Sequence, residues 1–102
     1  MKKYSIYQLD FSNPVVVNER IAYMSWDYII NHCGFDLQRY NKVYEGEIES
    51  DDIDSVTLEK LFRVFNIDHP ANFRGHSLSV SDVVILDGKK YYCDNYGWQL
   101  IS

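Results

Sequence analysis

Apolar and polar positions alternate near the start of the chain. Between residues 3 and 10, Tyr4 and Ile6 project to one side of an extended backbone, and most residues are types that favour strands. This pattern predicts a strand that ends before Asn13-Pro14. The three consecutive valines that follow fit either a short strand or the approach to a helix.

Two later segments repeat apolar residues at the spacing of an amphipathic helix. The first covers residues 25–33, with Ser25 as its N-cap and Gly34 just beyond its end. The second begins at Ser55 or Thr57, either of which can cap it. Its apolar stripe follows the i, i+3, i+4, i+7 rule through Leu58, Leu61, Phe62 and Phe65.

The last third of the chain predicts a β-meander. Strand-like runs at 81–86 and 89–94 are joined by an Asp-Gly dipeptide, which forms two-residue hairpins because glycine tolerates positive φ. A short strand at 98–101 follows, and a weaker alternation at 42–49 adds another. The order indicates an α+β fold: a mostly antiparallel sheet with a C-terminal hairpin or meander, and two helices packed on one face.

Composition narrows the class of protein. The 102 residues fit a single domain, 1–102, and an apolar content of 46% excludes intrinsic disorder. No signal-peptide pattern or membrane-length apolar run is present. Cys33 and Cys93 lie far apart and form no CxxC pair, so we expect reduced thiols, a cytoplasmic location and no membrane partner.

The net charge of −5 is concentrated in one segment. Seven of the 15 acids lie between positions 45 and 59, a span without Lys or Arg. In a strand, alternate carboxylates lie about 6.5–7 Å apart on one side, and such a row can imitate phosphates. The alternative is a solvated edge that blocks strand pairing. The partner-binding residues expected from the first interpretation are Tyr44, Glu45, Glu47, Glu49, Asp51, Asp52 and Asp54.

One octapeptide, GHSLSVSD at 75–82, holds the residue types of a nucleophilic triad. His76, Ser77 and Asp82 could act together, but a continuous strand cannot easily bring all three into contact. The simpler interpretation is a strand entrance whose hydroxyl groups satisfy turn backbone. The sequence contains no metal-ligand spacing and no phosphate-binding loop. We therefore assign no catalytic residue, metal, cofactor or small-molecule substrate.

Several longer stretches resemble the YodL-like domain. They are the segment Phe65–Val84, which includes GHSLSVSD, then Tyr91-Tyr92-Cys93-Asp94, Gly97, Tyr4-x-Ile6-Tyr7-Gln8-Leu9 and Val43-Tyr44-Glu45-Gly46. Trp98 stands where the family pattern has Phe. The resemblance implies a protein of a conjugative element or related mobile DNA, and it carries over no catalytic residue.

Size, acidity and this implied origin together suggest a function. Small acidic proteins of mobile elements often inhibit host defence, so we expect an anti-CRISPR type of inhibitor (type II-A). It would bind a Cas9-type effector, or interfere with its guide RNA loading, through the acidic surface. Two alternatives remain: a non-catalytic interaction module of a conjugative element, or a small RNA-cleaving enzyme that uses His76 with Ser77 or Asp82.

Overall fold

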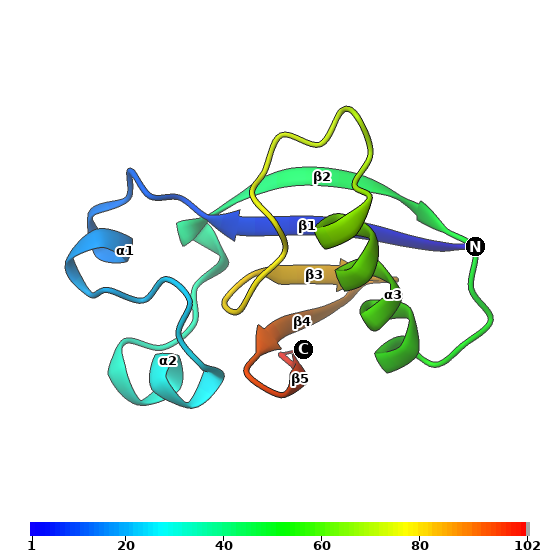
Figure 1. Cartoon of the computed structure of the whole chain (residues 1–102). Coiled ribbons are helices and arrows are strands. Elements are labelled where there is room, and N and C mark those ends of the chain that lie inside the picture. Colours follow the sequence, from blue (N-terminus) through cyan, green and yellow to red (C-terminus); the bar gives the residue numbers. More distant parts are fainter. Residues whose placement is uncertain (102) are drawn as a thin grey trace.

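A computed structural model of the chain describes residues 1–101 and contains one five-stranded antiparallel sheet. The strand order is β2-β1-β3-β4-β5. The strands are β1 (Lys2–Leu9), β2 (Tyr40–Ile48), β3 (Val83–Leu86), β4 (Lys89–Asp94) and β5 (Gly97–Leu100). The helices are α1 (Pro14–Asn18), α2 (Trp26–His32) and α3 (Asp54–Ile67), with a 3-10 turn at Leu37–Arg39. The predicted α+β class, antiparallel sheet and C-terminal meander are confirmed (Figure 1).

The start of each short helix follows from its capping residue. Asn13 accepts a hydrogen bond from the Val15 N–H (2.9 Å), and Pro14 occupies the first helical position, where its missing N–H costs nothing. The three valines are therefore helical rather than a strand. Ser25 caps α2, as predicted, by accepting the Tyr28 N–H (3.2 Å).

The start of α3 differs from the sequence prediction. Its N-cap position is Ile53, and no side chain caps the helix. Ser55 and Thr57 lie inside the first turns, so the prediction that one of them is the cap was wrong. Thr57 Oγ1 instead contacts Ser50 Oγ (2.7 Å) in the link from β2. The Asp54 carboxylate in the first turn suits the positive end of the helix dipole.

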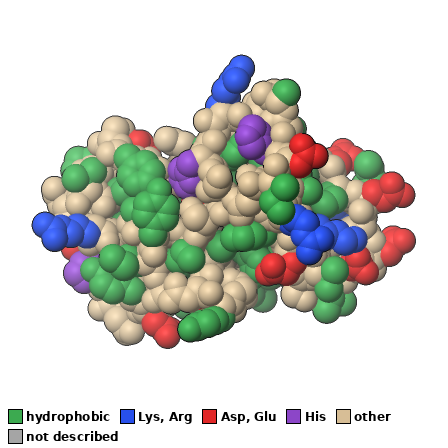
Figure 2. All heavy atoms as spheres, viewed as in Figure 1, with side chains coloured by type: hydrophobic (Ala, Val, Ile, Leu, Met, Phe, Trp, Pro, Cys, Tyr) green, Lys and Arg blue, Asp and Glu red, His purple; other side chains and the backbone are tan. Residues whose placement is uncertain are grey.

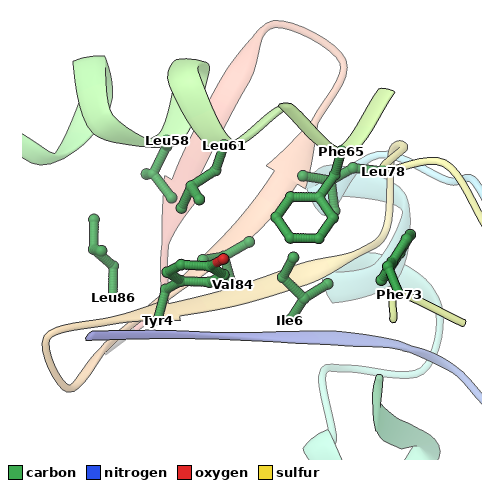
Figure 3. Close-up of a cluster of buried hydrophobic side chains, with 9 residues drawn as sticks. All are labelled: Tyr4, Ile6, Leu58, Leu61, Phe65, Phe73, Leu78, Val84 and Leu86. Atoms are coloured by element: carbon green, nitrogen blue, oxygen red, sulfur yellow. The ribbon is translucent and has the colours of Figure 1, made fainter. Parts of the chain in front are cut away.

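The sheet is covered on both faces. On one face, Leu58, Leu61 and Phe65 of α3 pack against alternate residues of β1 and β3: Tyr4, Ile6, Val84 and Leu86 (Figure 3). A second cluster joins Val16 of α1 and Ile29 of α2 to Leu9, Val83 and Tyr92. Val83 and Val84 are neighbours in one strand, so the two clusters lie on opposite faces.

This arrangement corrects the expectation that both main helices share a face. Figure 1 shows α1 and α2 together at the end of the sheet where β1 ends, whereas α3 lies across the strands. The strands carry apolar residues on both sides, and alternation shows which residues share a side without showing which helix covers it. Within the described residues, no helix is long and apolar enough to span a membrane.

The predicted hairpin is confirmed in detail. Asp87 and Gly88 both have positive φ (48° and 83°), as a type I′ turn requires, and they join Leu86 to Lys89 in register. The strand expected from residue 81 begins later, at Val83. Ser81 has a φ of 84°, which interrupts an extended backbone, and the octapeptide is an irregular loop.

Candidate functional site

The acidic segment begins on β2, an edge strand of the sheet. Glu45 and Glu47 pair in register with Ser5 and Lys3 of β1, on the face away from α3, and both are exposed. Glu45 forms an ion pair with Lys42 (3.1 Å). Figure 2 shows acidic side chains gathered at the end of the molecule where β2 leads into α3. The alternate spacing expected for this part of the row is present.

Tyr44 does not accompany these carboxylates. It lies on the opposite side of β2, where its ring packs against Phe65 (5.3 Å between centroids), Phe73 (6.0 Å) and Tyr4 (6.3 Å). Strand alternation forces this separation, because Tyr44 and Glu45 are adjacent in the chain. The side chain expected to anchor a partner therefore belongs to the packing under α3.

In the second half of the acidic segment, Asp52 and Asp54 form ion pairs with lysines of the same chain. Asp52 pairs with Lys60 (2.8 Å), and this hydrogen bond and charge lower the pKa of Asp52. Asp54 accepts a hydrogen bond from the Tyr91 hydroxyl and forms an ion pair with Lys2 (3.2 Å). These two interactions lower the pKa of Asp54.

Glu49 and Asp51 remain exposed and form no ion pair within residues 1–101. The seven expected residues therefore do not form one continuous row. We call Glu45, Glu47, Glu49 and Asp51 the acidic edge.

A second candidate site lies around Asp82, which is 1% exposed. Its Oδ2 accepts hydrogen bonds from the Ser79 N–H (2.9 Å) and from Gln8 Nε2 (3.1 Å). Gln8 Nε2 also donates to the His76 carbonyl (2.9 Å), and His76 Nε2 lies 3.9 Å from Asp82 Oδ1. At Gly75 a Cβ would lie 2.3 Å from Gln8 Oε1, so any larger residue there would have to displace the Gln8 side chain.

Burial dominates the electrostatics of this cluster. It raises the pKa of Asp82 to about 7, against the opposing effects of the Ser79 N–H, His76 and Gln8. A carboxyl with such a pKa beside a half-buried histidine is a pair that acid–base chemistry can use. The contact between Asp82 and His76 thus makes this cluster a candidate site for acid–base chemistry.

The serines of the octapeptide do not complete a nucleophilic triad. His76 Nδ1 lies 2.7 Å from the Ser77 carbonyl oxygen rather than from its hydroxyl. Ser81 Oγ accepts the Tyr23 N–H (3.0 Å), and Ser79 Oγ is buried without a hydrogen-bond partner. Within residues 1–101, none of these three hydroxyl groups forms a hydrogen bond with the imidazole that would have to activate it.

Two aromatic residues that the sequence did not single out flank His76. Phe11 and Tyr23 are each about half exposed, at 49% and 55%. Their ring centroids lie 6.3 and 6.1 Å from the His76 ring. Tyr23 has a positive φ of 64°, a strained conformation for a bulky residue.

The signal for Gln8 was present in the sequence, because alternation puts this polar residue on the same side of β1 as Tyr4 and Ile6. Nothing local marked Phe11 or Tyr23.

Neither cysteine forms a disulfide. Cys93 is buried in β4, and burial raises its pKa to about 12, so the thiol is protonated at neutral pH. Cys33 is half-buried at the end of α2, beside Arg39 Nη1 (3.5 Å). Within residues 1–101, no three His, Cys, Asp or Glu side chains are grouped closely enough to hold a metal ion.

The topology and the buried Asp82 cluster define a small α+β domain in which one antiparallel sheet carries helices on both faces. A family model for the YodL-like domain matches residues 3–102, so the chain belongs to the YodL-like domain family. No curated protein and no solved structure matches the chain.

Proposed function

We propose that this protein is a non-catalytic inhibitor from a mobile element, and that its acidic edge binds the basic surface of a nucleic-acid-handling defence protein. The observation that supports this function is the exposed series of carboxylates along an edge strand and the link that follows it. Acidic side chains at this spacing suit a channel that normally holds phosphates. The partner class we propose is a Cas9-type effector or its guide RNA complex, in the cytoplasm.

The proposed surface is narrower than the sequence suggested. Asp52 and Asp54 lie against Lys60 and Lys2, so their charges are already offset within the protein. Tyr44 is packed under α3. Glu45 is likewise paired, with Lys42. The contacts we assign to a partner are therefore limited to the part of the acidic edge without an ion pair within residues 1–101: Glu47, Glu49 and Asp51.

A charge-reversal experiment tests this function. Pull-down with a Cas9-type effector and a DNA cleavage assay would compare the parent protein with the double variant Glu47→Lys/Glu49→Lys. The matched control, Asp27→Lys/Asp68→Lys, makes the same charge change at exposed positions elsewhere. We expect inhibition to weaken about tenfold in the Glu47→Lys/Glu49→Lys variant and to stay unchanged in the control. Equal inhibition by both variants would reject the acidic edge as the binding surface.

If none of the three proteins binds the effector, the alternative is an interaction module that serves a partner encoded by the mobile element itself. Co-purification from cells that carry such an element would then identify that partner. If this partner no longer co-purifies with the Glu47→Lys/Glu49→Lys variant, binding would still be assigned to the acidic edge.

The Asp82 cluster favours a second candidate, an RNA-cleaving enzyme. Its basis is the contact between His76 and a buried carboxyl whose pKa is raised to about 7. Incubation with guide RNA would show cleavage that is lost in His76→Ala and retained in Ser77→Ala. Intact RNA after incubation with the parent protein would exclude this candidate.

A further inference from the structure

The groove beside β5 lies at the edge of the sheet opposite the acidic edge. A hollow of about 480 Å³ separates the first turns of α3 from β4 and β5, and a second hollow of about 230 Å³ adjoins it. Glu59 of α3 and Gly97 and Trp98 of β5 line both hollows. We call the two together the β5 groove.

The backbone of β5 is open along its outer side. Within the described sheet β5 pairs with β4 alone. Ile101 N–H donates to the Lys90 carbonyl (2.8 Å), and antiparallel strands turn alternate residues toward their partner. The backbone groups of Leu100 and Trp98 therefore face outward, where a further strand could bind them. The Leu100 carbonyl also accepts a hydrogen bond from Gln99 Nε2 (3.1 Å), an exposed contact that an added strand would replace or share.

The side chains of these two residues lie on the α3 side of the sheet. Trp98 is opposite Cys93 and Leu100 is opposite Tyr91, whose hydroxyl reaches Asp54 of α3. The Trp98 ring meets Phe62 edge-on (6.5 Å between centroids), and Leu100 is 51% exposed. Trp98 and Phe62 thus form an apolar part of the smaller hollow, and the exposed Leu100 lies beside the groove on the same face of the sheet.

The charges that line the β5 groove are all negative: Asp54, Glu59 and Asp94, with no Lys or Arg. Asp54 already has Lys2 and Lys89 beside it (3.2 and 3.8 Å). Asp94 Oδ1 accepts the N–H groups of Trp26 and Asn95.

Glu59 has no ion pair within residues 1–101, although it lies at the junction of the two hollows beside an indole ring. A carboxylate and an aromatic face together form a site that suits a cationic side chain.

We propose that β5 binds an extended segment of a partner protein as an additional strand, with an arginine of that segment between Glu59 and Trp98. Main-chain hydrogen bonds to β5 supply affinity, and the groove selects the alternate side chains. Apolar residues on either side of the arginine contact Leu100 and Val56, which is 42% exposed. This surface is separate from the acidic edge on β2 and binds independently of it.

A peptide titration tests this proposal. The probe is acetyl-Thr-Val-Thr-Arg-Thr-Val-Thr-amide, which directs Val, Arg and Val to one side when extended, added to isotope-labelled full-length protein. We expect amide chemical shift changes confined to residues 97–100 and the first turns of α3. A peptide with Glu in place of Arg should bind about fivefold more weakly.

Variants separate this site from other surfaces. Glu59→Gln should weaken binding of the arginine peptide about fivefold and leave binding of a valine-for-arginine peptide unchanged. Glu49→Gln, the same change on the opposite edge, should have no effect. Equal affinity for the Arg and Glu peptides, shifts elsewhere, or no shifts at the solubility limit would each overturn the proposal.

Self-association is the remaining outcome. If dilution of the protein alone shifts the β5 amides and sedimentation shows a dimer, a second copy of the chain occupies the edge, and the proposed partner segment is rejected. Failure of the acidic-edge experiment would not alter any of these results, because Glu47 and Glu49 lie on β2 and in the link after it.

Discussion

Asp82 makes the stability of the protein depend on pH, and Asp82→Asn should remove that dependence. The carboxyl is almost fully buried, and burial raises its pKa from 3.8 to about 7. An asparagine oxygen can accept the same hydrogen bonds from the Ser79 N–H and Gln8 Nε2 without carrying a charge at any pH. The substitution therefore isolates the effect of ionisation.

The direction follows from proton binding. Between about pH 4 and pH 7 the folded protein keeps the Asp82 proton, whereas the unfolded chain has lost it. The folded state binds more protons, so the free energy of unfolding falls as pH rises through this window. Above about pH 7 both states are ionised and the fall ends. The full shift corresponds to roughly 4 kcal/mol as an upper limit.

The buried tyrosines and the buried cysteine near Asp82 do not ionise in this window. Burial raises the pKa of Tyr40 and Tyr92 above the ordinary tyrosine value, and it raises that of Cys93 to about 12. All three therefore stay neutral. The charge of His76 opposes the Asp82 shift, and Asp82→Asn removes this interaction together with the carboxylate.

Urea unfolding of the parent protein and of Asp82→Asn, from about pH 4.5 to about pH 8, measures the effect. The parent should lose stability relative to the variant by up to roughly 3 kcal/mol over this range, which excludes the part of the window below about pH 4.5. Asp68→Asn, a change at an exposed carboxylate, should follow the parent curve. If the parent and Asp82→Asn curves run parallel, the Asp82 carboxylate is ionised in the folded state and the reasoning is refuted.

Three further substitutions test the packing by urea unfolding at neutral pH. Gly75→Ala should cost about 2 kcal/mol, because the new Cβ displaces Gln8 from its hydrogen bonds. Leu61→Ala should cost roughly 2–5 kcal/mol by opening a cavity under α3, and a loss below about 1 kcal/mol would contradict its place in the core. Ser79→Ala should raise stability by about 1 kcal/mol, since it removes a buried hydroxyl without a partner, and a loss of stability would show that the hydroxyl is hydrogen-bonded.

Local patterns predicted most of the elements. Ser25 and its following apolar spacing defined α2, and the Asp-Gly dipeptide defined the β3–β4 turn. The errors arose where a residue's role depends on a distant partner. The sequence predicted Thr57 as a helix cap, but its hydroxyl forms a hydrogen bond with the Ser50 hydroxyl in the link after β2. The valines after Pro14 were compatible with either a strand or the approach to a helix, and the neighbouring Asn13 cap makes them helical.

The sequence by itself determined the α+β class, the hairpin register and the concentration of charge in one segment, because each depends on neighbouring residues. Only the tertiary structure decided which helix covers which face, since alternation is symmetric about the sheet. It also divided the acidic segment, because strand β1 brings Lys2 to Asp54 and the turn of α3 brings Lys60 to Asp52. Gln8 meets Asp82 for the same reason: long-range strand pairing brings together side chains whose separation in the chain carries no signal.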